Sequence, residues 1–190
     1  MIKYIPGTVL DFDSKRNSCA FDVIKPFFAF TNGITLAQVR ELTGLETSTI
    51  QNWVKRGWVP SPINKRYGQR QIVRIMLINS IRRSMKIENV INLMTYINGD
   101  VEDTSDDVVS DEILFNEFCK AVYMCDTSHT CDFDVINALI SEQVTHIPDL
   151  DETGKTKLQK TLQIMTLAFL AAQLQDRVDE EISSIAPEIG

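Results

Sequence analysis

Apolar residues in the first half of the chain repeat at helical spacing and predict a pair of short helices. The first begins after Thr35, because Thr35 and Gln38 have the types and spacing of a capping box, and it ends at Gly44. The second runs from about residue 47 to residue 56 and ends at Gly57. Two short helices joined by a glycine-containing turn match the helix-turn-helix pattern.

The segment that follows contains prolines and cannot continue as a helix. Residues 58–68 contain Pro60, Pro62 and Gly68 beside several basic residues, which predicts a basic loop or a small wing. Helical spacing returns from Gln69, and a further helix is predicted from Ile87 to about residue 98. In the helix from Gln69 the apolar positions face inward, and the arginines are expected mainly on other faces: Arg70, Arg74, Arg82 and Arg83.

The second half of the chain also predicts helices. Residues 100–111 are acidic and indicate a linker or exposed loop, and helices are expected over residues 113–124 and 133–144. A last helix over about residues 155–185 has a wide apolar surface, which predicts packing against other helices on more than one side. The expected fold is mainly α, with a winged helix-turn-helix followed by an all-helical C-terminal bundle.

These elements suggest three parts. Residues 1–34 are expected to form an N-terminal extension that packs on the core, residues 35–99 a helix-turn-helix domain, and residues 100–190 an acidic helical domain. A chain of 190 residues with 44% hydrophobic and 24% charged residues has the composition of a soluble globular protein. That composition excludes a disordered chain, a collagen and a disulfide scaffold.

The distribution of charge changes the picture that the net charge gives. A net charge of −7 argues, as an average, against a partner as anionic as nucleic acid. Residues 36–86, however, carry ten basic and two acidic side chains, a net +8, whereas residues 87–190 carry a net −16 and residues 1–35 a net +1. Such asymmetry points to an anionic partner for the basic part.

The second predicted helix carries a polar stripe apart from its apolar one. Asn and Gln can pair with adenine edges in a major groove, and Lys with guanine or phosphate. The base-reading candidates of this stripe are Ser48, Gln51, Asn52 and Lys55. The side chains expected to anchor phosphates are Arg40, Arg56, Lys65, Arg66, Tyr67 and Arg70. The alternative is that the stripe is an ordinary solvated face.

Three aromatic residues beside these basic groups have two interpretations. Trp53, Trp58 and Tyr67 could stack on bases or sugars, but a small winged domain needs large side chains in its core, so packing is the favoured interpretation. The hydroxyl of Tyr67 could still reach a phosphate.

The same residues carry a family resemblance. The run from Leu36 to Leu45, the pair Thr49-Ile50, the run from Lys55 to Pro60 and the pair Arg66-Tyr67 resemble the winged helix-turn-helix of MerR-type regulators, over about residues 34–98. The resemblance implies a recognition helix with Ser48, Thr49, Gln51, Asn52 and Lys55, which makes Thr49 a fifth base-reading candidate. It also implies a wing with Lys65, Arg66 and Tyr67.

A second resemblance is closer. The runs Thr49–Pro60, Lys65–Tyr67 and Ile78–Arg82, with Pro62, resemble an uncharacterised bacterial family, described as a domain of unknown function with a MerR-like N-terminal half. Two features depart from MerR regulators. Gln51-Asn52 stands where they usually carry Arg-Tyr, and about 90 further residues with an acidic net charge follow where they have one long dimerisation helix.

No constellation for catalysis or metal binding stands out. Cys125, His129 and Cys131 lie close together and Cys119 precedes them, but their spacing lacks the paired form of structural zinc sites, so incidental thiols are the favoured interpretation. We therefore expect no enzyme, no cofactor and no metal. The N-terminus lacks the features of a signal peptide, and the longest apolar stretch, 13 residues from Leu162, is too short to span a bilayer, which predicts a cytoplasmic protein without a membrane partner.

The sequence thus predicts a DNA-binding protein, a transcription regulator that contacts duplex DNA through a recognition helix and a basic wing. Its C-terminal helices are expected to form a homodimer, because dimers double the base contacts of a small domain. A small-molecule effector is not indicated by any motif. The rival hypothesis is a protein-interaction adaptor whose helix-turn-helix contacts an acidic partner or its own acidic half.

Overall fold

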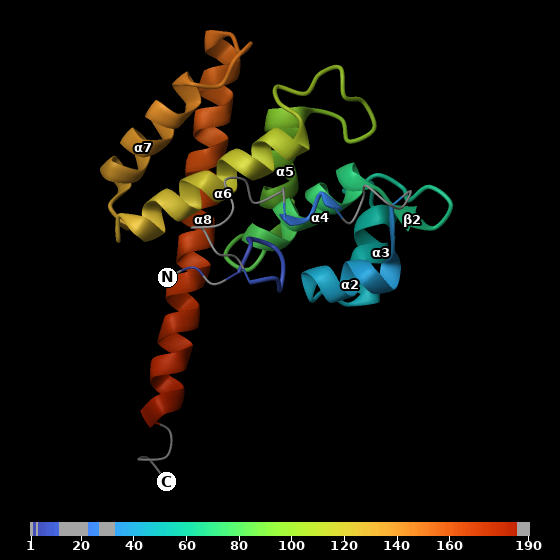
Figure 1. Ribbon diagram of the computed structural model, residues 1–190, viewed down its shortest axis with the longest axis horizontal. Helices are drawn as coiled ribbons and strands as arrows, with labels where there is room; N and C mark the ends of the chain where they lie inside the picture. The colour runs from blue at the N-terminus through green and yellow to red at the C-terminus, as the bar shows by residue number, and fades with distance from the viewer. Residues whose placement is uncertain (1, 3, 12–22, 27–32, 186–190) are drawn as a thin grey trace.

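A computed structural model of the chain describes residue 2 and residues 4–11, 23–26 and 33–185 (Figure 1). Most of the predicted extension over residues 1–34, including Cys19, lies outside the described residues. From the part that is described, Ile5 and Ile24 are fully buried in the core.

The described residues form a mainly helical fold, as the sequence predicts. A two-stranded antiparallel sheet pairs β1 with β2, with Ile34 opposite Tyr67. The elements in chain order are β1 (Ile34–Thr35), α2 (Leu36–Thr43), α3 (Thr47–Lys55), β2 (Arg66–Tyr67), α4 (Gln69–Ile81), α5 (Ile87–Asn98), α6 (Asp111–Thr127), α7 (Phe133–Thr145) and α8 (Glu152–Ile185). Each predicted helix is present, with its ends shifted by up to three residues.

The predicted boundaries of the first helix have the expected local causes. Thr35 Oγ1 accepts a hydrogen bond from the Gln38 backbone N–H, and Gln38 Oε1 accepts one from the Thr35 N–H, so the capping box is confirmed. Gly44 ends α2 in the left-handed conformation, with φ of 68°. Only residues 44–46 separate α2 from α3.

The basic segment after α3 forms a tight hairpin turn. Ile63 and Arg66 exchange two backbone hydrogen bonds, of 3.0 and 2.9 Å, around Asn64 and Lys65. Both central residues have positive φ, 50° and 62°, which is the conformation of a type I′ turn. The loop expected from the sequence is therefore a fixed hairpin that presents Lys65 at its tip.

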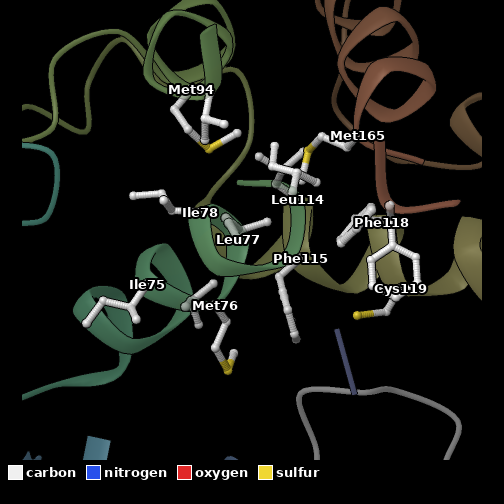
Figure 2. Packing of buried hydrophobic residues seen from close by; sticks show 14 of the residues in the cluster. Ile75, Met76, Leu77, Ile78, Met94, Leu114, Phe115, Phe118, Cys119 and Met165 are labelled. Carbon is white, nitrogen blue, oxygen red and sulfur yellow. The ribbon is translucent and has the colours of Figure 1, made fainter. Parts of the chain in front are cut away.

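Helix α4 lies at the centre of the molecule. Figure 2 shows Ile75, Met76, Leu77 and Ile78 of this helix among residues of α5, α6 and α8. Ten of its thirteen residues are buried. One hydrophobic cluster extends from Ile5 to Phe169 and so crosses the expected boundary between residues 99 and 100.

Helix α8 packs against α4, α5, α6 and α7, so the prediction that it contacts several helices is confirmed. Leu158, Leu162, Met165 and Phe169 are buried along the first half of the helix. Its last part extends beyond the other elements, at the opposite side of the molecule from α2 and α3 (Figure 1).

The expectation that Arg74 lies on an outer face of α4 is wrong. Its side chain is only 4% exposed, and Nη1 donates to Asp111 Oδ1 at 3.0 Å. Asn98 Nδ2 donates to the same oxygen at 3.0 Å. Because helices cover α4 on almost every side, an arginine in its middle has no path to solvent and is stabilised by a carboxylate from α6.

Removal of the Asp111 carboxylate should be costly, because it leaves the Arg74 charge buried without its partner. We expect Asp111→Ala to lower the free energy of unfolding by about 3 kcal/mol, measured by urea denaturation at neutral pH. The matched control is Asp134→Ala, since Asp134 occupies the first turn of α7 in the same way but is exposed. Its expected loss is below about 1 kcal/mol, and equal losses for the two variants would contradict the assignment.

Candidate nucleic-acid interface

Helix α3 separates its apolar and polar side chains onto different faces. Ile50 is fully buried and Trp53 is 4% exposed, so this face fixes the helix to the rest of the fold. The opposite face presents four of the five base-reading candidates to solvent: Ser48, Gln51, Asn52 and Lys55. Thr49 is half-buried. The polar stripe predicted from the sequence is therefore an exposed, rigidly held surface.

The C-terminal end of α3 carries a small cluster of interacting side chains. Arg56 Nε donates to Asn52 Oδ1 at 3.3 Å, and the Arg56 guanidinium lies 5.0 Å from the centre of the Trp58 ring. These contacts orient both Asn52, a base-reading candidate, and Arg56, a phosphate-binding candidate. Trp58 is itself half-buried, and its ring makes a cation–π contact with the Arg56 guanidinium.

A hollow of about 290 Å³ lies beside this cluster, between α3 and the beginning of α5. Arg56 and Arg82 line it together with Trp53 and Trp58, and Glu88 is the acidic residue at its edge. The Arg82 guanidinium lies 5.9 Å from the centre of the Trp53 ring. Burial, with the nearby positive charge of Arg83, lowers the pKa of Arg82.

Arg82 is a basic residue of this surface that the sequence does not single out as a candidate. Arg82 contributes to the net charge of +8 over residues 36–86. Helical spacing predicts its place at the end of α4 but not its neighbours. Its position beside α3 depends on how α4 packs, which no local pattern encodes.

The hairpin contributes basic groups of two kinds. Lys65 is exposed at the tip. Arg66 is exposed as well, but Nη1 donates to the Gly33 carbonyl at 2.9 Å and so ties the hairpin to the segment before β1. Tyr67 is only 4% exposed, and burial raises the pKa of its phenol. The packing interpretation is thus confirmed for Trp53 and Tyr67.

Two other phosphate-binding candidates lie in different surroundings. Arg40 of α2 is exposed and lies 3.8 Å from Glu46. Arg70 is half-buried, and its Nη2 donates to the Val101 carbonyl at 2.7 Å. The structure therefore brings Asn52 and Arg56 together on α3 and holds Lys65 and Arg66 on the hairpin, while Arg70 contacts the loop after α5.

The three cysteines that the structure describes lie away from this surface. Cys119 and Cys125 are buried in α6 and Cys131 is exposed, and burial raises the pKa of the Cys125 thiol. Within the described ranges, no group of three or more His, Cys, Asp or Glu side chains is arranged to hold a metal ion. Among the helices described, none combines the length and the apolar character needed to cross a bilayer.

Together the fold and this surface define a mainly helical protein that presents an exposed polar helix beside a basic hairpin. Residues 28–118 match the model of a family described as a domain of unknown function, DUF1836. This span contains both strands, α2 to α5 and the beginning of α6. The chain is also 27% identical, over 165 residues, to the uncharacterized protein YkrK of Bacillus subtilis, covering 80% of this chain and 70% of that protein.

No solved structure matches the chain significantly. The two matches support the expected likeness to an uncharacterised family.

Proposed function

We propose that the protein binds duplex DNA and regulates transcription, with α3 as the recognition helix of a MerR-like winged helix-turn-helix. The observation that carries the proposal is the division of α3 into a buried anchoring face and an exposed stripe of Ser48, Gln51, Asn52 and Lys55. An α-helix fits the major groove of B-DNA, and Asn and Gln side chains there can make two hydrogen bonds to adenine.

The hairpin serves as the wing in this proposal. Its I′ turn and the Arg66 contact to Gly33 fix its shape before DNA arrives, so docking costs little conformational entropy. Lys65 and Arg66 would contact phosphates, which position the protein without reading sequence. Tyr67 contributes to the wing by packing, because it is buried in the core directly after the hairpin turn.

The distribution of charge supports the same orientation. Residues 36–86 carry a net +8 and residues 87–190 a net −16. Figure 1 shows α2 and α3 at one side of the molecule and α7 and α8 at the other, so the acidic helices need not approach the duplex when α3 does. Phosphate neutralisation by the basic part would make binding strongly dependent on salt.

The projecting end of α8 supports a homodimer as the DNA-binding form. Leu174, Val178 and Ile182 are 55, 50 and 58% exposed and follow one another at intervals of four residues. They therefore form an apolar stripe on the part of α8 that projects beyond the other helices (Figure 1). Pairing with the same stripe of a second copy would bury it, and two winged domains would then read two half-sites.

The DNA-binding proposal predicts a division of labour between wing and helix. The double variant Lys65→Ala, Arg66→Ala should weaken binding about tenfold or more on every duplex and reduce the salt dependence, because it removes phosphate contacts. Asn52→Ala should instead change which sequences are preferred. Both effects are measured by selection from a random duplex pool and by titration at several salt concentrations.

Lys160→Ala is the control, because Lys160 is an exposed cation on the acidic half and should not change binding. If the wild-type protein has no affinity at low salt, or an affinity that salt does not change, the proposal is wrong and the adaptor hypothesis gains support. A uniform loss from both the wing and the helix variants would contradict the division of labour.

The dimer proposal is tested at the stripe on α8. We expect Val178→Asp with Ile182→Asp to convert a concentration-dependent dimer into a monomer, because the substitutions place charge in the paired apolar surface; sedimentation equilibrium measures the mass. Ser184→Asp adds one carboxylate on a face of the helix away from the stripe and should leave the dimer intact. A wild-type protein that stays monomeric up to about 100 µM, where its free energy of association would be weaker than about −5.5 kcal/mol, would overturn this part of the proposal.

A further inference from the structure

A cavity of about 830 Å³ lies on the side of the molecule formed by the beginnings of α4 and α6. The loop before α6, around Asp107, and the loop between α7 and α8, around Pro148, complete its walls. Its volume falls within the usual range for small-molecule sites, about 300–1,000 Å³. None of the base-reading candidates lines it, and Arg70 is the phosphate-binding candidate that does.

The walls of this cavity are largely apolar. Val73, Val109, Ile113, Ile147 and Leu150 all contribute to its lining. Ile113 is 42% exposed although it is a large apolar side chain at the beginning of a well-packed helix. An occupant with an apolar body would remove this surface from water, which is the main favourable contribution in most small-molecule sites.

The charged groups around the cavity are mostly acidic. Among the described residues of the lining, which also include His146, Arg70 is the one Arg or Lys, and its guanidinium already donates to the Val101 carbonyl. The carboxylates in the lining are those of Asp107, Asp111, Glu112, Glu117 and Asp149. An anionic occupant would meet this excess of negative charge, whereas a cation would be attracted by it.

Three of these carboxylates already have partners inside the protein. Asp111 accepts hydrogen bonds from Arg74 and Asn98, Glu112 accepts one from Gln69, and Glu117 accepts one from Gln143. Asp107 is half-buried, and its carboxylate has no hydrogen bond or salt bridge to any residue that the structure describes. Burial, and then the negative charge of Asp111, raise the pKa of Asp107 to about 6, against the opposing positive charges of Arg70 and Arg74. Arg70 and Arg74 donate hydrogen bonds to other groups, so they act on the Asp107 carboxylate only from a distance.

We propose that this cavity binds a small organic cation, an ammonium group on an apolar body, with the ammonium at Asp107 and the body against Val109, Ile113 and Ile147. A bare metal ion fits the cavity poorly, because such ions require several oxygen ligands together, and no three carboxylates among the described residues are arranged to hold one. The proposal concerns ligand binding alone and holds whether or not the protein binds DNA.

The test is a titration of the full chain, followed by proton–nitrogen NMR at pH 7.5, with 4-phenylbutylamine as the cationic probe and 4-phenylbutanol as its neutral counterpart. We expect the amine to bind at least tenfold more tightly than the alcohol, with shifts at the residues lining the cavity. Asp107→Asn should remove this preference, so that the two probes bind alike. The variant should fold at least as stably as the wild type at this pH, because it removes a charge that burial disfavours.

Two further variants separate the site from general effects. Asp103→Asn removes a carboxylate from the same loop at a position outside the lining and should keep the preference for the amine. Ile113→Trp enlarges a partly exposed side chain into the cavity and should abolish binding of both probes. Equal affinities of the amine and the alcohol for the wild type, a preference that survives Asp107→Asn, or shifts that map elsewhere would each overturn the proposal.

Discussion

The buried contact between Arg74 of α4 and Asp111 of α6 is the constraint on which the arrangement of the two halves depends. It joins the basic segment to the acidic one through a charge pair that is almost fully removed from water, with Asn98 of α5 bound to the same carboxylate oxygen. Such a pair tolerates little displacement, because an uncompensated buried charge is far more costly than a slightly imperfect apolar contact. The opposite net charges of the two segments would favour many loose encounters between them, and this contact selects one.

That single arrangement leaves the outer face of α3 uncovered. The acidic part of the chain packs on α4 through α5, α6 and α8. Asp176 of α8 also pairs with Arg83, just after the end of α4. The face of α3 that packs inward is occupied by Ile50 and Trp53. The polar stripe is therefore exposed, because the acidic half of the chain packs on α4 and not on the outer face of α3. An anionic partner requires such an uncovered surface.

Local patterns were sufficient for the helices and their ends. The capping box at Thr35, the left-handed Gly44 and the spacing of Leu158, Leu162 and Met165 are each encoded within one or two turns of chain. Contacts between distant segments were not predictable in this way. The partner of Arg74 lies 37 residues further along the chain, and Arg70 is directed to Val101 by the path of a loop. Arg82 beside α3 and the cavity at Asp107 likewise depend on packing. Local patterns therefore predict the exposed polar face of α3 but not the side chains that distant segments place around it.

The first turn of α4 connects the cavity to the hairpin. Gln71 Nε2 donates to the Ser61 carbonyl at 3.1 Å, and Gln71 Oε1 accepts from the Gly68 N–H at 3.1 Å, so this one buried side chain ties the beginning of α4 to the segment that carries the hairpin. Gln69 and Arg70 of the same turn line the cavity. An occupant that shifts this turn would shift the hairpin with it, because the hydrogen bonds of Gln71 allow little independent movement. The occupant of the cavity would then change the affinity of the hairpin for an anion. By thermodynamic linkage, the bound anion would change the affinity of the cavity for its occupant by the same factor. This coupling requires that the turn has a second position and that a ligand binds to one position more tightly than to the other. Asp107 lies on a loop outside α4, so a cation bound there would contact the turn differently in its two positions.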